Sequence, residues 1–244
     1  MAERRVLALD FDGVFWNSVR ECYEVSLEAW KEAGMPPFSQ PYERFRDGRW
    51  LVRAGRDFGT LMRLLEDDPK LDILAYTPEQ FAEAGKANAE LVQRFGECFG
   101  RIRLQYRWER EAYWRSLQQP FQAVLDALPV WKERFVEVAV ATTKDSESTR
   151  ALLEQADLDI PVYGLEVGTD KSRHMQLLID KYKVEPHNVY FIDDLLINLC
   201  DAAKAGIRGY LALWGYNNEA SRRKAEKMGF GLLAEEDLPD LGLD

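Results

Sequence analysis

The sequence predicts an α/β fold built on a parallel β-sheet, with an all-helical segment inserted after the first strand. Short apolar runs alternate with helical patterns in the second half of the chain, which is typical of a parallel sheet flanked by helices. A separate strand pattern stands at the N-terminus, and no convincing strand follows it before about residue 120. We therefore expect the first strand to join the later ones across a long helical insertion.

Composition limits the classes of partner. The 244 residues carry 32 lysines and arginines against 42 aspartates and glutamates, a net charge of -10. So acidic a surface argues against nucleic acid and against anionic membranes as partners, and a phosphate site would need its own positive charge. No apolar run reaches the roughly 18 residues that a membrane span requires.

The numbers and positions of cysteine and histidine residues limit the cellular compartment and the kinds of metal or catalytic centre. The three cysteines are far apart and lack the spacing of a zinc or redox motif, so we expect a reduced, cytoplasmic setting. The N-terminus runs straight into the first strand and leaves no room for a signal peptide. With only two histidines, a histidine-rich metal centre and a Ser/His triad are both disfavoured. His174, one turn after Lys171, is expected at the surface.

The first strand ends in a pair of carboxylates. The apolar run 6–9 is followed by Asp10, Asp12 and Gly13. Strand side chains alternate, so Asp10 and Asp12 point the same way at the carboxyl end of the strand, where parallel sheets bind ligands. Two such carboxylates suit a hard cation, or a nucleophile beside an acid/base. The alternatives are a turn cap and the metal clamp of a sugar transferase.

The sequence predicts that the insertion is helical. Ser18 and Glu21 resemble a capping box before a helix that Gly34 stops, and Thr77-Pro78-Glu79 begins another. Long helices follow, with interruptions expected at two glycines, Gly96 and Gly100. The tryptophans of this region either fill the core of a helical bundle or line a substrate pocket: Trp16, Trp30, Trp50, Trp108 and Trp114. A group of arginines is either a solvated helix face or an anion-recognition surface: Arg44, Arg46, Arg49, Arg53 and Arg56.

The second half supplies four more strands, at 136–141, 161–165, 189–192 and 208–213, the last of them closing the sheet. Chemically active residues follow the first three of these strands: Thr142, then Lys171, then Asp193 and Asp194. Residues 234–244 are acidic and are expected to form a solvated tail with Leu238 docked.

Together these residues form a set suited to phosphoryl transfer. A carboxylate can attack phosphorus, and a second carboxyl can protonate the leaving oxygen and later deprotonate water. A magnesium ion held by carboxylates neutralises charge, and a hydroxyl and an ammonium can bind the remaining phosphoryl oxygens.

At this point the sequence resembles the haloacid dehalogenase superfamily of aspartate-nucleophile hydrolases, and in particular its phosphoglycolate-phosphatase-like branch. The motifs occur in order: Asp10-Phe11-Asp12-Gly13-Val14, Thr142, Lys171, and Asp193-Asp194 with Asn198. The stretches 205–207 and 213–216 also look like that branch. The resemblance implies a Rossmann-like core formed by 1–15 and 130–244, and a helical cap formed by 16–129.

The resemblance also implies roles. Asp10 would be the nucleophile, and Asp12 the general acid/base whose backbone carbonyl also binds the metal. Gly13, the Thr142 hydroxyl and the Thr143 backbone would bind the phosphoryl group, while Lys171 would hold Asp10 and the phosphate.

For the metal, the implied ion is Mg²⁺. Asp194 would be its main acidic ligand, because Asn198 and Gly206 fall at the family's spacing from it. Asp193 stands where many relatives have glycine and is a further candidate ligand beside Asp10 and Asp12.

The implied function is a magnesium-dependent phosphatase that hydrolyses a small phosphorylated metabolite through an aspartyl-phosphate. Asp12 favours phosphate esters over carbon–halogen bonds, since an alkoxide needs a proton to leave and a halide does not. Arg49 or Arg53 would read an anionic leaving group. The alternatives are a phosphomutase or phosphotransferase of the same superfamily and, from a different class, a phosphoaspartate signalling protein or a binding protein without turnover. Signalling receiver domains carry their acidic pair first, which is the opposite order from this chain.

Overall fold

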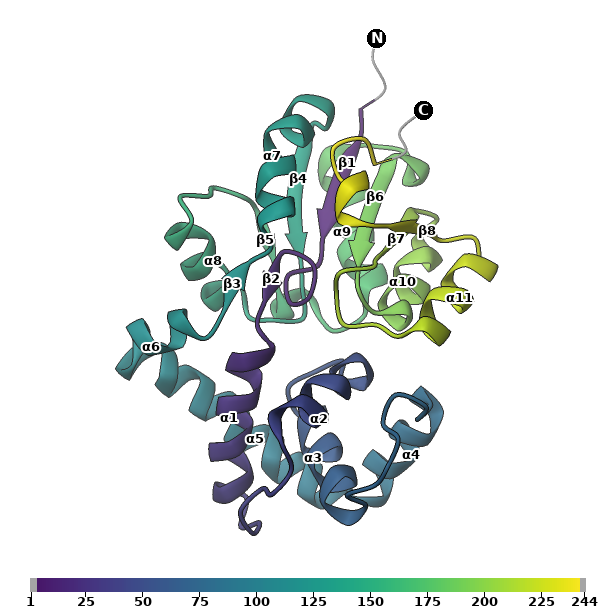
Figure 1. The fold of residues 1–244 in the computed structure, drawn as a ribbon. Coiled ribbons are helices and arrows are strands. Elements are labelled where there is room, and N and C mark those ends of the chain that lie inside the picture. The colour runs from purple at the N-terminus through teal and green to yellow at the C-terminus, as the bar shows by residue number, and fades with distance from the viewer. Residues whose placement is uncertain (1–3, 242–244) are drawn as a thin grey trace. The chain divides into compact units, whose positions relative to one another are not determined.

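The computed structural model describes residues 4–241, which form two compact units (Figure 1). The first unit contains the chain up to Asn17 and from Pro120 onward, and the second unit contains Ser18–Gln119. Each unit has its own buried core.

The first unit is built on a six-stranded sheet in the order β5-β4-β1-β6-β7-β8, and each neighbouring pair is parallel. This confirms the predicted parallel α/β core. The strands are β1 (Val6–Leu9), β4 (Glu137–Ala141), β5 (Val162–Tyr163), β6 (Val189–Asp193), β7 (Arg208–Ala212) and β8 (Gly231–Leu233).

Strand β1 lies at the centre of this sheet, between β4 and β6. Leu9, its last residue, pairs with Val140 on one side and with Ile192 on the other. The three strands therefore end at nearly the same level, so the residues that follow them emerge at one edge of the sheet.

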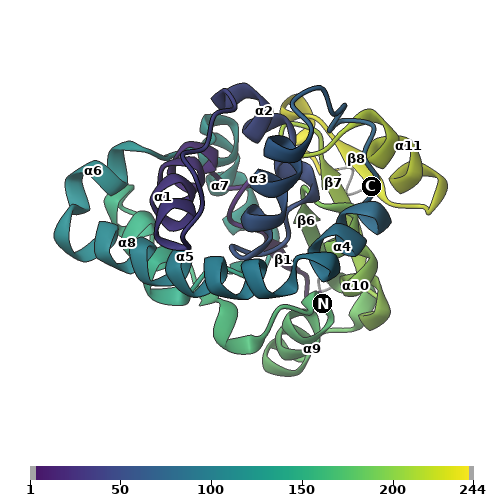
Figure 2. The same cartoon turned by 90° about the horizontal axis from the view of Figure 1, so that it is seen from below.

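Helices cover both faces of the sheet, as Figure 2 shows for α7 on one side of β1 and β6 and for α9 and α10 on the other. The buried cluster on the α9 and α10 face includes Val6, Ala8 and Phe191 from the strands, with Met175 and Leu199 from the helices. Because strand side chains alternate, Leu7 and Leu9 face the other layer. The helices of this unit are α7 (Gln122–Arg134), α8 (Ser146–Gln155), α9 (Lys171–Tyr182), α10 (Leu196–Ala202) and α11 (Glu219–Lys227), with short 3₁₀ turns at η2 (Leu165–Val167), η3 (Pro186–Asn188), η4 (Ala203–Ala205) and η5 (Glu235–Asp237).

The C-terminal part of the sheet differs from the prediction. Residues 208–213 were expected to be the last strand, but α11 and then β8 follow. Both are weak signals in the sequence, since β8 has three residues and α11 buries only Ala225. The docking of Leu238 is confirmed: it is fully buried, and its carbonyl accepts a 2.7 Å hydrogen bond from the Trp131 indole. Leu241 is buried as well, so 234–241 is not simply a solvated tail; 242–244 lie outside the described residues.

The boundary after the insertion also differs. The sequence predicts an insertion that extends to residue 129, whereas the structure groups Pro120 onward with the sheet unit. The reason is that α7 continues through Pro129. A proline inside a helix removes one backbone hydrogen bond. The helix persists because Ala127, Leu128 and Trp131 around it are buried.

The second unit is helical, with α1 (Val19–Glu32), α2 (Tyr42–Asp47), α3 (Asp57–Asp67), α4 (Pro78–Ala87), α5 (Ala89–Glu109), α6 (Glu111–Ser116) and the 3₁₀ turn η1 (Arg49–Leu51). Its core contains stacked and edge-on aromatic pairs, among them Phe45 with Phe58, and Trp30 with Phe95. Outside these helices, β2 (Trp16–Asn17) and β3 (Gln119–Pro120) pair as a two-stranded sheet.

Two local predictions for this unit have opposite outcomes. The helix start at Thr77 is confirmed, because Thr77 and Gln80 form a reciprocal capping box. The interruptions expected at Gly96 and Gly100 are wrong, since α5 runs through both. Gly96 instead allows a close approach, because a Cβ there would lie 2.7 Å from the Arg56 Cβ.

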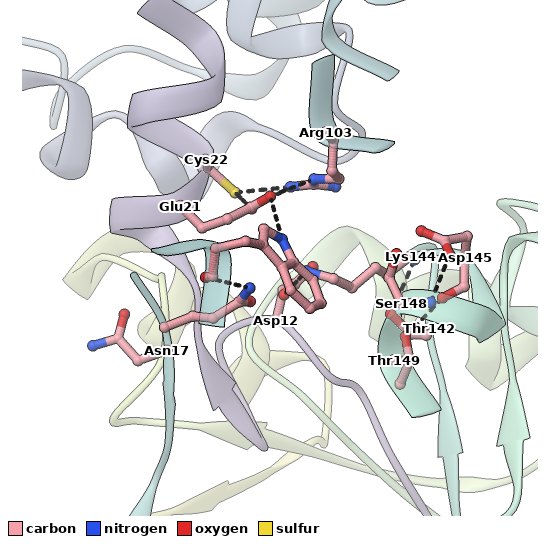
Figure 3. Close-up of polar contacts among 12 residues, drawn as sticks. Asp12, Asn17, Glu21, Cys22, Arg103, Thr142, Lys144, Asp145, Ser148 and Thr149 are labelled. Atoms are coloured by element: carbon pink, nitrogen blue, oxygen red, sulfur yellow. Dashed lines mark hydrogen bonds and ion pairs between the residues drawn. The ribbon is translucent and has the colours of Figure 1, made fainter. Parts of the chain in front are cut away.

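The capping box expected at Ser18 is also wrong. Ser18 makes no side-chain cap hydrogen bond, and Glu21 turns into the core (Figure 3). There the fully buried Glu21 carboxylate accepts hydrogen bonds from Arg103 at 2.7 and 2.8 Å and one from the Trp114 indole at 3.3 Å. A strong charge-assisted pair thus outweighs a local cap.

Within residues 4–241, no helix combines the length and the apolar character needed to cross a membrane.

The buried pair predicts a large stability effect. Arg103→Ala leaves the Glu21 carboxylate buried without its partner, which should lower the free energy of unfolding by about 3–5 kcal/mol. Arg101→Ala removes a solvent-exposed arginine from the same helix and should cost far less. Denaturant unfolding of the three full-length proteins measures this difference, and equal losses in the two variants would contradict it.

Candidate active site

The loop after β1 positions the two leading carboxylates. The Asp10 N–H donates to the Ile192 carbonyl at 2.9 Å, which holds Asp10 in line with the sheet. The Phe11 carbonyl then accepts hydrogen bonds from the N–H groups of Phe15 and Trp16 at 3.0 and 2.8 Å. Gly13 takes φ +99°, a conformation that favours glycine. This tight loop keeps Asp10 and Asp12 together at the edge of the sheet.

Lys171 lies against Asp10, as the sequence analysis predicted. It is the first residue of α9, and the Asp170 carboxylate caps the helix by accepting from the Ser172 N–H at 2.9 Å. The fully buried Lys171 ammonium donates to Asp10 Oδ1 at 2.5 Å and to the Ala141 carbonyl. It also lies 3.6 Å from Asp193 Oδ2. Burying an ammonium costs several kcal/mol unless it is paired, and Asp10 supplies the pairing charge.

Three buried carboxylates meet beside this lysine. One oxygen each of Asp10, Asp193 and Asp194 lies within 4.8 Å of the other two. Burial, together with the neighbouring Asp10 carboxylate, raises the pKa of Asp193 to about 7. A set of oxygen donors with this much negative charge suits a hard divalent cation such as Mg²⁺.

The backbone of two glycines fixes the position of Asp194. A Cβ on Gly13 would lie 2.3 Å from Asp194 Oδ2, and one on Gly215 would lie 2.3 Å from the Asp194 Cβ. The Tyr216 N–H donates to Asp194 Oδ2 at 2.7 Å. The segment 213–216 therefore acts as part of the site by packing directly against an acidic residue.

Asn198 supports the acidic cluster through Asp193. Its amide donates to both carboxylate oxygens of Asp193 at 3.1 Å, and the Leu195 N–H donates to Asp193 Oδ1 at 2.8 Å. The start of α10 at Leu196 brings the amide to Asp193. The choice of Asp194 as main metal ligand, made from the spacing of Asn198 and Gly206, stays a prediction.

The turn after β4 carries a residue that the sequence analysis did not select. Thr142 is buried, its N–H donates to the Tyr163 carbonyl at 2.9 Å, and its hydroxyl accepts from the Lys144 N–H at 3.1 Å. Thr143 is half-buried. The Lys144 ammonium donates to Asp12 Oδ1 at 3.1 Å (Figure 3). The sequence feature that could have identified Lys144 is its position directly after Thr142 and Thr143 at the end of a strand.

The arginines expected to read the substrate belong to the second unit. Arg49 is 7% exposed, donates to the Val52 carbonyl at 2.6 Å and lies over the Phe58 ring. Arg53 is half-buried, and its N–H donates to Asp57 at 3.1 Å. Their roles toward a substrate stay predictions.

The expectation that His174 lies at the surface is wrong. His174 is fully buried, with Nε2 3.2 Å from the Gly164 carbonyl oxygen. It follows Lys171 by three residues on α9, so both side chains lie on the inward face of the helix. Burial lowers the pKa of His174.

Comparisons with known proteins agree with this geometry. The family model of haloacid dehalogenase-like hydrolases matches residues 5–206. The chain therefore belongs to the haloacid dehalogenase-like hydrolase family, which confirms the resemblance inferred from the motifs. A search of curated proteins found no match.

Solved structures share the fold over nearly the whole chain. A haloacid dehalogenase-like family protein from Streptococcus pneumoniae has a TM-score of 0.61, with 16% identity and 99% of each chain covered. A predicted phosphoglycolate phosphatase from Haemophilus somnus has a TM-score of 0.65, with 16% identity and 99% of each chain covered. A protein from Thermotoga maritima described as a β-phosphoglucomutase has a TM-score of 0.58, with 19% identity and 97% of each chain covered.

The packing at Gly13 predicts a specific defect. Gly13→Ala strains a positive φ and drives the new Cβ into Asp194, so it should destabilise the protein by about 2–4 kcal/mol. Gly229→Ala is the matched control. Gly229 has φ +84°, and a Cβ added there would meet nothing within 4 Å, so this substitution carries the backbone strain alone. Thermal and denaturant unfolding compare the two variants. A loss in Gly13→Ala no greater than that in Gly229→Ala would contradict the proposed packing of Asp194.

Proposed function

We propose that the protein is a magnesium-dependent phosphatase that hydrolyses a small phosphorylated metabolite. The observation that carries this proposal is the buried Lys171–Asp10 pair beside the Asp193 and Asp194 carboxylates. This arrangement presents a nucleophile, a fixed positive charge and a set of oxygen donors at one edge of the sheet. The family assignment agrees with a hydrolase.

In the first step, an Asp10 carboxylate oxygen attacks phosphorus and the ester P–O bond breaks, which leaves an aspartyl-phosphate. The leaving oxygen takes the proton of the Asp12 carboxyl. The Lys171 ammonium and the Thr142 hydroxyl, with the Thr143 and Gly13 backbone, bind the phosphoryl oxygens.

In the second step, Asp12 removes a proton from water, and the oxygen of that water attacks the phosphorus. The Asp10–phosphorus bond breaks, Asp10 recovers its carboxylate, and inorganic phosphate leaves. The proton that Asp12 gave up is thereby restored, so the cycle closes.

Asp10, Asp193 and Asp194, with the Asp12 backbone carbonyl, are the residues that would hold Mg²⁺. When bound, the ion would reduce the repulsion between the carboxylates and the negatively charged phosphoryl group. The carboxylate oxygen set and the raised pKa of Asp193 support this assignment.

Under this proposal the second unit, Ser18–Gln119, is the cap that excludes water and selects the leaving group. Arg49 and Arg53 are its predicted residues for an anionic leaving group. The competing function is a phosphomutase, whose fold is represented among the similar structures. A phosphatase releases free phosphate from a substrate without an added acceptor, and a mutase does not, so the product identifies the reaction.

The nucleophile can be tested directly. Asp10→Asn removes the attacking carboxylate, so phosphate release from an aryl phosphate with Mg²⁺ should fall at least about a thousandfold. Asp126→Asn is the control, because Asp126 is exposed on α7 and accepts only a local 2.8 Å hydrogen bond from Gln122 among the contacts described. Undiminished turnover in Asp10→Asn would rule out this nucleophile.

Removal of metal should produce a pH-dependent loss of stability. The folded-state pKa of Asp193, about 7, is above the unfolded value of roughly 3.9. The stabilisation that the protonated Asp193 carboxyl provides is fully present below the pKa of the unfolded state, and it is lost as the pH rises through the pKa of the folded state. Metal-free protein should therefore lose this contribution between about pH 4 and 7, and Mg²⁺ should restore stability most at the upper end.

The measurement is the unfolding midpoint at pH 5 and pH 8, with Mg²⁺ and with a chelator. The difference between wild type and Asp193→Asn isolates the aspartate from other titrating groups. Mg²⁺ that stabilises the wild type equally at both pH values would contradict the assignment of Asp193 to the cation site.

A further inference from the structure

Two lysines and two aspartates form separate ion pairs at the edge of the sheet. Lys171 pairs with Asp10, and Lys144 pairs with Asp12. The proposed reaction uses the first pair to bind the nucleophile and phosphate, but it assigns nothing to Lys144. The Lys144 side chain is 0% exposed, whereas the Asp12 side chain is 15% exposed. A buried ammonium therefore contacts a partly exposed carboxyl.

The turn after β4 determines where the Lys144 side chain begins. The Lys144 N–H donates to the Thr142 hydroxyl at 3.1 Å, and the Lys144 carbonyl accepts from the Leu165 N–H at 2.9 Å. The next residue, Asp145, caps α8 by accepting from the Ser148 N–H at 2.7 Å (Figure 3). Both peptide groups of Lys144 are therefore held, and the path of the side chain starts from a rigid point.

The other end of the side chain is also constrained. Lys144 Nζ lies 3.1 Å from Asp12 Oδ1 and 5.8 Å from the centre of the Phe11 ring, which is fully buried. A buried lysine loses its rotamer freedom, and the cost of dehydrating its charge is offset by the carboxylate. The position of the ammonium thus limits the rotamers that the Asp12 carboxyl can adopt.

We propose that Lys144 is a positioning residue whose ammonium holds the Asp12 carboxyl in the rotamer from which it transfers a proton to the leaving oxygen. This inference rests on the proposed phosphatase function. Lys144 itself gains and loses no proton in either step. Because the Lys144 ammonium donates to Oδ1, the proton that moves to the oxygen of the breaking P–O bond is the one carried by Oδ2 of the protonated Asp12, and Lys144 acts only through the orientation of Asp12.

This role differs from direct phosphate binding in what it predicts for the leaving group. An alkyl phosphate expels a strongly basic oxygen, which needs the proton of a well-placed acid. A p-nitrophenyl phosphate expels a weakly basic oxygen and depends on that proton much less. A lysine that orients the acid therefore affects the first step selectively for the alkyl ester, whereas one that binds the phosphoryl group affects the first step for both esters.

The central test is Lys144→Met, which keeps most of the side-chain length and removes the charge. The comparison uses kcat/KM, because kcat/KM reports the steps up to departure of the leaving group and omits the hydrolysis of the aspartyl-phosphate, in which Asp12 acts for both esters alike. With Mg²⁺ present, kcat/KM for a simple alkyl phosphate should fall about 10- to 100-fold, within the range that general acid catalysis contributes. For p-nitrophenyl phosphate, kcat/KM should fall less than about 3-fold. Lys204→Met is the control, because Lys204 is exposed and pairs with Asp201 within its own turn.

A double-mutant cycle with Asp12→Asn separates positioning from an independent role. If Lys144 acts through Asp12, then Lys144→Met should cause no further loss of kcat/KM in the Asp12→Asn background. Additive losses of kcat/KM, or equal losses of kcat/KM for the two esters, would each overturn the inference. Lys144→Arg retains the charge and should recover part of the alkyl phosphate activity, so it tests the same point if the methionine variant folds poorly.

A structural readout keeps the inference separate from the proposed function. A crystal structure of Lys144→Met should show the Asp12 carboxyl in a changed rotamer or in more than one. A single, unchanged rotamer would overturn the positioning role whatever the activity. In contrast, wild-type protein that releases no phosphate from either ester would overturn the proposed function, while the rotamer comparison would still decide what Lys144 does to Asp12.

Discussion

The burial of the Lys171 ammonium against the Asp10 carboxylate is the interaction on which the rest of the first unit depends. An ammonium with no exposed surface is tolerated only where a negative charge meets it at close range. That requirement joins the start of α9 to the end of β1, two segments about 160 residues apart in the chain. The ends of β4 and β6 lie on either side of β1, and Lys171 also reaches both of them, through the Ala141 carbonyl and beside Asp193.

Charge balance is the main electrostatic constraint on this site. Three buried carboxylates lie within 4.8 Å of one another, and Lys171 supplies one positive charge beside Asp10 and Asp193. Burial, and after it the neighbouring Asp10 carboxylate, raises the pKa of Asp193, so this group tends to retain a proton. A divalent cation relieves the excess of negative charge without a proton. The overall acidity of the chain adds to this demand, because a distant basic surface cannot provide the compensation.

Backbone packing contributes as much to the site as side-chain chemistry does. Gly13 and Gly215 have no Cβ, so their backbone can approach Asp194 closely, and the Tyr216 N–H donates to its carboxylate. Lys144 is likewise placed by a turn whose hydrogen bonds involve Thr142 and Leu165. In both cases a rigid strand end carries the functional group, so the charged atoms are located before any ligand binds.

By itself, the sequence determined the parallel α/β core, the order of the strands along the chain and the meeting of Asp10, Lys171 and the second acidic pair. The apolar runs predict the strands, and the polar residues directly after them predict the site. These residues are expected to meet because parallel strands present their carboxyl ends at one edge of the sheet. Only the tertiary structure decided the partners that depend on distant segments. Glu21 has the local sequence pattern of a helix cap, but in the structure it pairs with Arg103 in the core. In the same way, Asn198 donates to Asp193 and Lys144 donates to Asp12. The spacing of residues along the chain does not predict such pairs. Packing between distant elements sets their geometry, and burial sets their energy, and neither can be inferred from a local sequence pattern.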